Sequence, residues 1–184
     1  MDGRHWKLLS RTACLALAAA AIGLTGMAAA HAAADIAPGS ASGLPIPRFV
    51  SLKADRVNVR AGPTKDHDVA WVYTRSGLPV EVTAEFENRR RIRDWEGAEG
   101  WVYHSMLSGK RTAIVSVATK AKDDLVPLHE TASPESELAA KLQAGVLGAV
   151  KSCQSGWCRI AGKGFDGWIQ QERLWGVYPN EKVE

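Results

Sequence analysis

Short runs of alternating apolar and polar residues, separated by turn residues, make up most of the chain from Arg48 onward. In Val57-Asn-Val-Arg the alternation has the period of a strand with one buried face, and few windows have a helical period. The expected strands lie at residues 49–52, 57–60, 69–73, 78–83 and 100–103, and around Ile92. Short strands at this spacing predict an all-β fold, either a small barrel or a sandwich.

The second half of the chain repeats the first at an offset of 67 to 69 residues. Val57 to Thr64 corresponds to residues 126–133, and Glu99-Gly-Trp-Val corresponds to Asp166-Gly-Trp-Ile. A repeat of this length, with its own strands, indicates a domain duplication. The predicted units are a first domain at 48–110, a second domain at 111–179 and a short tail at 180–184.

One segment of the second repeat favours a helix by composition. In residues 133–145, Ser133 suits an N-cap, Pro134 a first turn and Gly145 a helix end. The corresponding segment of the first repeat, residues 68–74, favours a strand. Because the two repeats share a fold, we expect a strand here too, with at most a helical turn near Pro134.

The N-terminal region has the organisation of a secretory signal. Residues 1–11 are polar and basic, residues 12–30 are apolar, and Ala-x-Ala cleavage patterns follow. This predicts a Sec-type signal peptide at 1–34, with an uncleaved membrane anchor as the alternative. The chain would then be periplasmic or otherwise exported, with no stable membrane span after cleavage. Residues 35–47 are rich in Pro, Gly and Ser and predict a flexible leader.

The charge of the chain belongs largely to this signal. The formal charge is +3 for the whole sequence, and it falls to about +1 once residues 1–34 are removed. The remaining chain gives no electrostatic argument for a nucleic-acid partner.

Cys153 and Cys158 are the cysteines that remain after cleavage. If Ser155-Gly156 form a two-residue hairpin turn, the two cysteines face one another across neighbouring strands. An exported compartment permits a disulfide between them. The alternative is half of a metal site, which the few other candidate ligands disfavour, so no metal and no cofactor are expected.

The motifs Val57-Asn-Val-Arg-Ala-Gly-Pro and Glu99-Gly-Trp-Val, with a Leu a few residues later, resemble the bacterial SH3-like (SH3b) domain. The whole chain is similar to exported tandem-SH3 proteins of Gram-negative bacteria. The resemblance implies two tandem SH3-like β-barrels, each small and strongly bent, in a protein of the cell envelope. Such domains often act beside peptidoglycan-active enzymes. One departure is Arg89-Arg-Arg-Ile92, which has Arg where the second repeat has Trp157.

Aromatic side chains are the main candidates for binding. By analogy with the peptide groove of eukaryotic SH3 domains, a ligand-binding cluster would comprise Trp71, Tyr73, Trp101 and Tyr103. Trp95 adds a further aromatic surface, and Arg91, Arg93 and Trp95 would share a strand face that allows a cation–π stack. For each ring, packing into the core or between the domains is the alternative.

The polar residues of Val57-Asn-Val-Arg-Ala-Gly-Pro allow two interpretations. Asn58 and Arg60 either fasten the following loop by hydrogen bonds to backbone or carboxylate, or Arg60 holds a ligand. The alternating valines belong to the core in both cases.

These observations favour an exported, non-enzymatic binding or scaffolding module that contacts peptidoglycan or an envelope protein or peptide. The alternative is a regulatory or targeting partner of a cell-wall hydrolase or secretion complex. A hydrolase is disfavoured because His67, His104 and His129 are scattered and the cysteines are expected to be bridged. The oligomeric state stays open.

Overall fold

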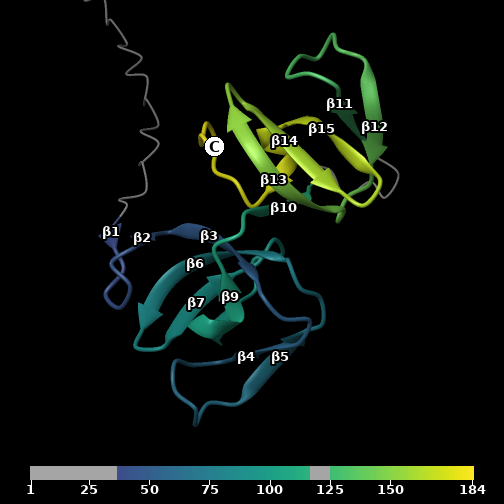
Figure 1. The fold of residues 1–184 in the computed structure, drawn as a ribbon. Coiled ribbons are helices and arrows are strands. Elements are labelled where there is room, and N and C mark those ends of the chain that lie inside the picture. The colour runs from purple at the N-terminus through teal and green to yellow at the C-terminus, as the bar shows by residue number, and fades with distance from the viewer. Residues whose placement is uncertain (1–36, 117–124) are drawn as a thin grey trace, which may run out of the picture. The chain divides into compact units, whose positions relative to one another are not determined.

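The computed structural model describes residues 37–116 and 125–184, so the expected signal peptide at 1–34 lies outside the described residues. Two seven-stranded antiparallel sheets follow one another along the chain (Figure 1). We call them the first barrel, built from β3 to β9, and the second barrel, built from β10 to β16. The prediction of an all-β fold built from two repeated units is confirmed.

The first barrel has the strand order β5-β4-β8-β7-β6-β3-β9. Its elements are β3 (Arg48–Leu52), β4 (Val57–Arg60), β5 (Val69–Tyr73), β6 (Pro79–Phe86), β7 (Arg89–Arg93), β8 (Glu99–Tyr103), the 3-10 turn η1 (His104–Met106) and β9 (Leu107–Ser108).

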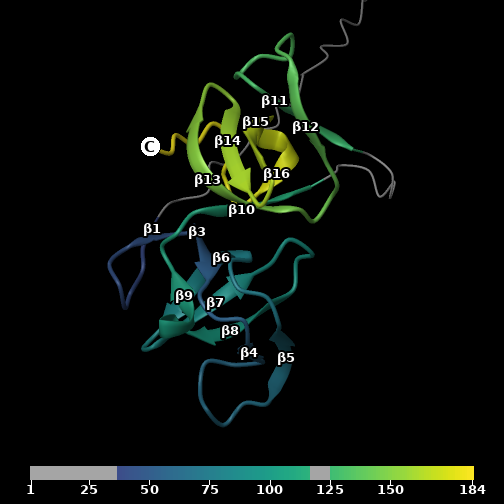
Figure 2. The same ribbon diagram turned by 45° about the vertical axis from the view of Figure 1, so that its right-hand side comes forward.

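The second barrel has the corresponding order, β12-β11-β15-β14-β13-β10-β16. Its elements are β10 (Thr112–Val115), β11 (Val126–His129), β12 (Leu138–Leu142), β13 (Leu147–Gln154), β14 (Trp157–Gly162), β15 (Phe165–Gln170), the 3-10 turn η2 (Gln171–Arg173) and β16 (Leu174–Trp175). The hairpins β4–β5 and β11–β12 project from equivalent ends of their sheets (Figures 1 and 2).

The segment with helical composition is a strand, as the repeat predicts. Residues 134–135 form a turn, and β12 then pairs with β11, with Leu142 opposite Val126. Pairing and burial of Leu142 therefore override the local helix propensity.

Alternation along the strands builds both cores. Val57 and Val59 of β4 are fully buried, and so is Val102 of β8, as the pattern predicts. In the second barrel Leu128 of β11 and Ile169 of β15 are likewise fully buried. The shared apolar positions are therefore the fold's common framework.

Gly100 and Gly167, from the repeated Gly-Trp motif, let two strands cross closely. A Cβ at Gly100 would clash with Cγ1 of Val59, and one at Gly167 would lie 2.7 Å from the carbonyl oxygen of His129. Each glycine thus has a steric reason to be at its position.

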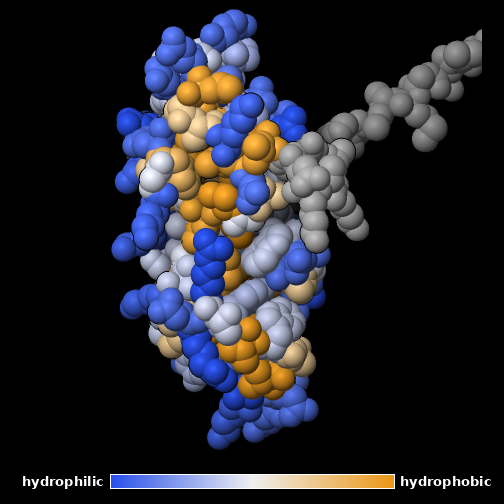
Figure 3. All heavy atoms as spheres, turned by 90° about the vertical axis from the view of Figure 1, so that its right-hand side faces the viewer, coloured by the Kyte–Doolittle hydropathy of each residue, from blue (hydrophilic) through white to orange (hydrophobic). Residues whose placement is uncertain are grey.

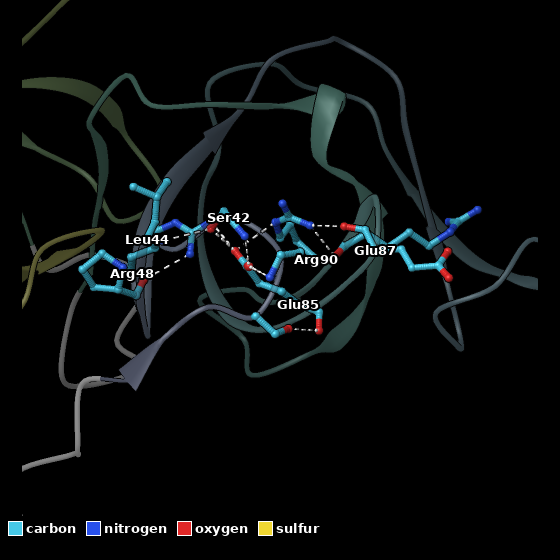
Figure 4. A network of polar contacts seen from close by, with 10 residues as sticks. Ser42, Leu44, Arg48, Glu85, Glu87 and Arg90 are labelled. Atoms are coloured by element: carbon cyan, nitrogen blue, oxygen red, sulfur yellow. Dashed lines mark hydrogen bonds and ion pairs between the residues drawn. The ribbon is translucent and has the colours of Figure 1, made fainter.

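The described part of the predicted leader contains a short strand pair. β1 (Ala37–Pro38) pairs with β2 (Pro45–Ile46), and we call residues 37–46 the leader hairpin. The Glu85 carboxylate of β6 accepts hydrogen bonds from the backbone amides of Ala41 and Ser42 at 3.0 and 2.8 Å (Figure 4). Turn-forming composition is compatible with order here because a buried carboxylate satisfies the turn's amides.

Residues 37–116 and 125–184 belong to one compact unit. The Phe49 ring lies 5.2 Å from Trp175 and 4.6 Å from Tyr178, measured between ring centroids. The Tyr178 hydroxyl donates to Glu81 at 2.9 Å. Three aromatic rings that were not selected from the sequence thus contribute to the contact between the barrels.

Candidate functional site

A surface pocket of about 300 Å³ lies on the first barrel between the ends of β4, β7 and β8. Its lining residues are Arg56, Asn58, Arg60, Arg89, Tyr103 and Met106, and we call it the arginine pocket. Asn58 and Arg60 belong to β4, whereas Arg89 begins β7, Tyr103 ends β8 and Met106 lies in η1.

The strand pattern explains why these side chains meet. Because Val57 and Val59 point into the core, Asn58 and Arg60 point away from it. On β8, Val102 points inward, so Tyr103 points outward and is 47% exposed. Arg89 is the register partner of Tyr103, and its guanidinium carbon lies 4.6 Å from the centroid of the Tyr103 ring. The cation–π contact therefore follows directly from the pairing of β7 with β8.

The arginine pocket is positively charged and has no carboxylate in its lining. Within residues 37–116 and 125–184, none of Arg56, Arg60 and Arg89 forms an ion pair. Arg60 donates from Nη1 to the carbonyl oxygen of His67 at 2.6 Å. The guanidinium of Arg89 makes no hydrogen bond with the described residues, although Arg89 is only 7% exposed. The donors of Arg89 are therefore free to bind a ligand in the pocket.

The second barrel has an equivalent pocket of about 290 Å³ with a different character. Its lining residues are Val126, Pro127, His129, Pro134, Trp157, Ile169, Gln170 and Arg173. The strand registers place Trp157 at the position of Arg89, Gln170 at that of Tyr103 and His129 at that of Arg60. His129 packs edge-on against Trp157 with 5.5 Å between ring centroids. We call this the tryptophan pocket.

The structure answers the question raised by Arg60. Its hydrogen bond to the His67 carbonyl ties the β4–β5 loop back to β4, which is the loop-fastening role predicted from the sequence. In the second barrel His129 Nδ1 lies 3.0 Å from the carbonyl oxygen of Ser136 in the equivalent loop. A carbonyl only accepts, so Nδ1 carries the proton. Arg60 and His129 therefore fasten equivalent loops in the two barrels. Arg60 uses one of its five N–H donors for this, and the others can bind a ligand in the pocket.

Two of the predicted aromatic residues are placed away from the exposed surface. Tyr73 is 8% exposed, and its hydroxyl donates to Asp94 at 2.7 Å. Burial and this hydrogen bond raise the pKa of Tyr73. Trp71 packs edge-on against it at 6.2 Å and is half-buried against the core. The expectation of one four-ring cluster needs correction, because β5 directs Tyr73 into the core.

The other predicted residues are divided between different surfaces. Trp101 is half-buried opposite Arg60, and Tyr103 lines the arginine pocket. Trp95 is 38% exposed in the turn after β7. The expected stack with Trp95 is not formed, because Arg91 pairs with Glu99 and Arg93 pairs with Glu81.

Arg89 lines the pocket but was not predicted as a site residue from the sequence. The signal for it was present, since aligning the repeats already set Arg89 against Trp157. Arg89 stands in a run with Arg90 and Arg91, and a run of arginines is usually a solvated surface, so the run by itself does not single out Arg89. Only the register with Tyr103 distinguishes Arg89 from them.

A hollow of about 750 Å³, more than twice the volume of the arginine pocket, is a weaker candidate. It lies at the contact between the barrels and includes Phe49, Glu81, Arg93, Trp175 and Tyr178. Its buried carboxylate, Glu81, is already paired with Arg93 and accepts from Tyr178. Burial raises the pKa of Tyr178 further from neutrality. Glu81, Arg93 and Tyr178 thus satisfy one another, and the polar atom left without a partner among the described residues of this hollow is the buried Nε1 of Trp175.

The predicted disulfide is confirmed. Ser155-Gly156 form the turn, Cys153 faces Cys158 across β13 and β14, and the two Cα atoms are 4.1 Å apart. A bridged cysteine carries no thiolate and cannot act as a nucleophile. In the described part of the chain, no group of three or more His, Cys, Asp or Glu side chains is arranged to hold a metal ion.

Exposed apolar side chains mark a second kind of surface. β5 and β12 are the edge strands of their sheets, and Val69 and Leu138 on them are 41% and 50% exposed. These strands lie on the right-hand side of Figure 1, which faces the viewer in Figure 3, where apolar atoms gather on both barrels. No helix within the described ranges is long and apolar enough to cross a membrane.

The strand order, the two equivalent pockets and the shared glycines define a tandem of small SH3-like barrels. The family model described as "Bacterial SH3 domain" matches residues 53–109 and 122–176, which is more than half of the chain. The chain therefore belongs to the bacterial SH3 domain family, whose domains are of a binding type.

Two solved structures are similar in part. NlpC2 from Trichomonas vaginalis has 14% sequence identity and a TM-score of 0.31, with 72% of this chain and 49% of that chain covered. NlpC1 from the same organism has 14% identity and a TM-score of 0.31, with 74% and 48% covered. The chain thus spans about half the length of these proteins. No curated protein matches significantly.

Proposed function

We propose that the protein is an exported, non-enzymatic binding module for peptidoglycan or for a peptide of the cell envelope. The observation that carries the proposal is the pair of equivalent pockets. One lies between β4, β7 and β8 and the other between β11, β14 and β15, and each has an aromatic side chain in its wall, Tyr103 in one and Trp157 in the other. Aromatic faces suit sugar rings and peptide stems, since rigid rings lose little entropy on binding.

Two pockets on one chain favour a polymeric ligand. A repeating polymer allows the second binding event to follow the first at high effective concentration, so two weak sites give a useful combined affinity. Two pockets on one chain therefore favour an envelope polymer over a single small molecule. The pockets' small volumes, about 300 and 290 Å³, are consistent with two weak sites.

Co-sedimentation with purified peptidoglycan sacculi tests the proposal. The full sequence is expressed in bacterial cells, and the exported product is purified and its N-terminus determined. We expect retention at low salt, with a clear loss in Tyr103→Ala or Trp157→Ala and the greatest loss in the double variant. Trp95→Ala is the matched control, because Trp95 is exposed outside both pockets. A product that stays in the cytoplasm, or wild-type protein that is not retained at low salt, would contradict the proposal.

A regulatory or targeting partner of a cell-wall hydrolase is the second candidate. The exposed apolar Val69 and Leu138 on the edge strands favour it, because open strand edges with apolar side chains suit protein contacts. Cross-linking in cells separates the two candidates. Recovery of one protein and no glycan would support the second.

A further inference from the structure

We infer that the arginine pocket is a carboxylate-binding site for an acidic peptide, with Arg89 as the residue that recognises the carboxylate. This inference deepens the proposed function by naming the ligand chemistry of one of its two pockets. It rests first on the burial of Arg89 in a site without a counter-ion.

A buried arginine ordinarily has an acceptor, because taking a guanidinium out of water costs free energy that ion pairs or hydrogen bonds must offset. Arg90, the next residue, follows this rule: it is equally buried, pairs with Glu85 at 3.1 Å and donates to two carbonyl oxygens. Arg89 has the Tyr103 ring beside its guanidinium and no acceptor among the described residues. An acceptor from a ligand would complete its environment.

The remaining lining residues favour a peptide around that acceptor. Asn58 supplies a neutral amide, Tyr103 a hydroxyl, and Met106 an adaptable apolar surface. Arg60 is held by its bond to the His67 carbonyl, and Arg56 is exposed at the edge of the pocket. Amide, hydroxyl and thioether groups suit the backbone and side chains of a short peptide.

The number of buried charges favours a carboxylate over a phosphate group. Arg89 is the arginine of this pocket that is more than nine-tenths buried, although its guanidinium nitrogens keep some contact with solvent, and one carboxylate balances it through two parallel hydrogen bonds. A phosphate monoester carries a charge of about −1.5 to −2 at neutral pH and would need a second buried cation. Phosphate binding is therefore the outcome against which the inference is tested.

The first experiment titrates the exported protein with the acidic dipeptide N-acetyl-Ala-Glu-amide, followed by NMR of the arginine Nε–Hε and backbone signals. We expect saturable shifts at Arg89 and Tyr103, and none with N-acetyl-Ala-Gln-amide. Arg89→Gln should weaken binding about ten-fold or more, because it removes a charged bidentate contact. Arg91→Gln is the matched control on the same strand face, and its affinity should stay within about two-fold.

Three outcomes would overturn the inference: no saturable shift, equal binding of the Gln dipeptide, or stronger shifts at Arg89 with inorganic phosphate at matched ionic strength. If Arg89→Gln does not fold, Arg89→Trp replaces it, since the second barrel carries Trp157 at this position. That variant should also lose the dipeptide.

The sacculus assay separates this inference from the proposed function. If sacculi retain Arg89→Gln as well as wild-type protein, and the dipeptide does not bind, the inference fails while the proposed function stands. If the dipeptide binds saturably through Arg89 but sacculi are not retained, the carboxylate site stands and peptidoglycan binding fails.

Discussion

The two barrels hold the same cross-strand position together in different ways. In the first barrel Glu85 of β6 faces Arg90 of β7, and the two form an ion pair at 3.1 Å. In the second barrel Cys153 and Cys158 occupy the equivalent positions and form a disulfide. The registers correspond in detail, since each hairpin has its irregularity at the same place before this pair. The two barrels therefore share a cross-strand link at this position, although it is an ion pair in the first barrel and a disulfide in the second.

The difference decides which terminal segment each hairpin holds. The Glu85 carboxylate has acceptor capacity beyond Arg90, and it binds Arg48 at 2.8 Å and the turn of the leader hairpin (Figure 4). The disulfide offers no such acceptor, and Cys153 instead exchanges backbone hydrogen bonds with Val183 near the other end of the chain. The Glu85 carboxylate can therefore bind further side chains and backbone amides. The disulfide has no such acceptor, so the segment near Val183 pairs with the backbone of Cys153 alone.

The largest expected effect comes from Glu85→Gln. Loss of the carboxylate leaves Arg90 and Arg48 without their shared partner, so the free energy of unfolding should fall by about 3 kcal/mol. Urea denaturation at neutral pH measures this. Glu99→Gln is the control, because it breaks an exposed pair with Arg91 worth about 0–1 kcal/mol. Equal effects of the two substitutions would refute the special role given to Glu85.

Acid should weaken the same link in wild-type protein. Burial raises the pKa of Glu85, but hydrogen bonds from Ser42, Arg48 and Ala41 outweigh it and lower the pKa from 4.5 to about 2. Because the folded pKa is depressed, the stabilisation is fully present above pH 4.5 and is lost as the pH falls toward 2. Across this window we expect a loss of about 1–3 kcal/mol that Glu85→Gln lacks.

Denaturation curves at several pH values between 5 and 2 measure this loss, using the pKa window of Glu85. Other carboxylates also titrate there, so the quantity that decides is the difference in slope between wild-type protein and Glu85→Gln. If the free energy of unfolding fell with pH equally in the two proteins, Glu85 would not be the cause of the acid sensitivity.

The fold could be predicted from the sequence because it depends on patterns that are local to each strand. The alternation of Val57 and Val59, the Gly-Trp motifs and the repeat offset all report buried faces and close crossings. The disulfide was predictable for the same reason, since a two-residue turn fixes which residues face one another. These features need no knowledge of distant partners.

The site was predicted only in part because its members are brought together by long-range pairing. Tyr103 and Arg60 were selected, but Arg89 meets Tyr103 only through the register of β7 and β8. Tyr73 was selected for the surface, yet its hydroxyl finds Asp94, 21 residues away in sequence. The leader hairpin likewise could not be predicted from its local sequence, because its turn is held by hydrogen bonds to the distant Glu85.

Removal of the disulfide should have a smaller effect than removal of Glu85. Cys153 and Cys158 are only five residues apart, and closing so short a loop restricts the unfolded chain little. The double variant Cys153→Ser/Cys158→Ser should therefore lose about 2 kcal/mol. Denaturation of oxidised wild-type protein, reduced wild-type protein and the double variant provides the comparison. A loss greater than that of Glu85→Gln would reverse the ranking of the two links.

The smallest expected effect concerns the two loop-fastening side chains, Arg60 and His129. Each reaches one backbone carbonyl of its own hairpin loop, that of His67 or Ser136, so substitution by Ala should cost about 1 kcal/mol in either barrel. Hydrogen exchange of the loop amides should rise locally in each variant.

Dipeptide binding should distinguish the two variants. Arg60→Ala also removes a positive charge from the arginine pocket and should lower the affinity for the acidic dipeptide, whereas His129→Ala should leave that affinity unchanged. If His129→Ala weakened the dipeptide as much as Arg60→Ala does, loop order in general, and not the charge of Arg60, would govern binding. If neither substitution changed exchange or binding, the role of Arg60 would be neither structural nor functional, and the correspondence between the two barrels would end at their cores.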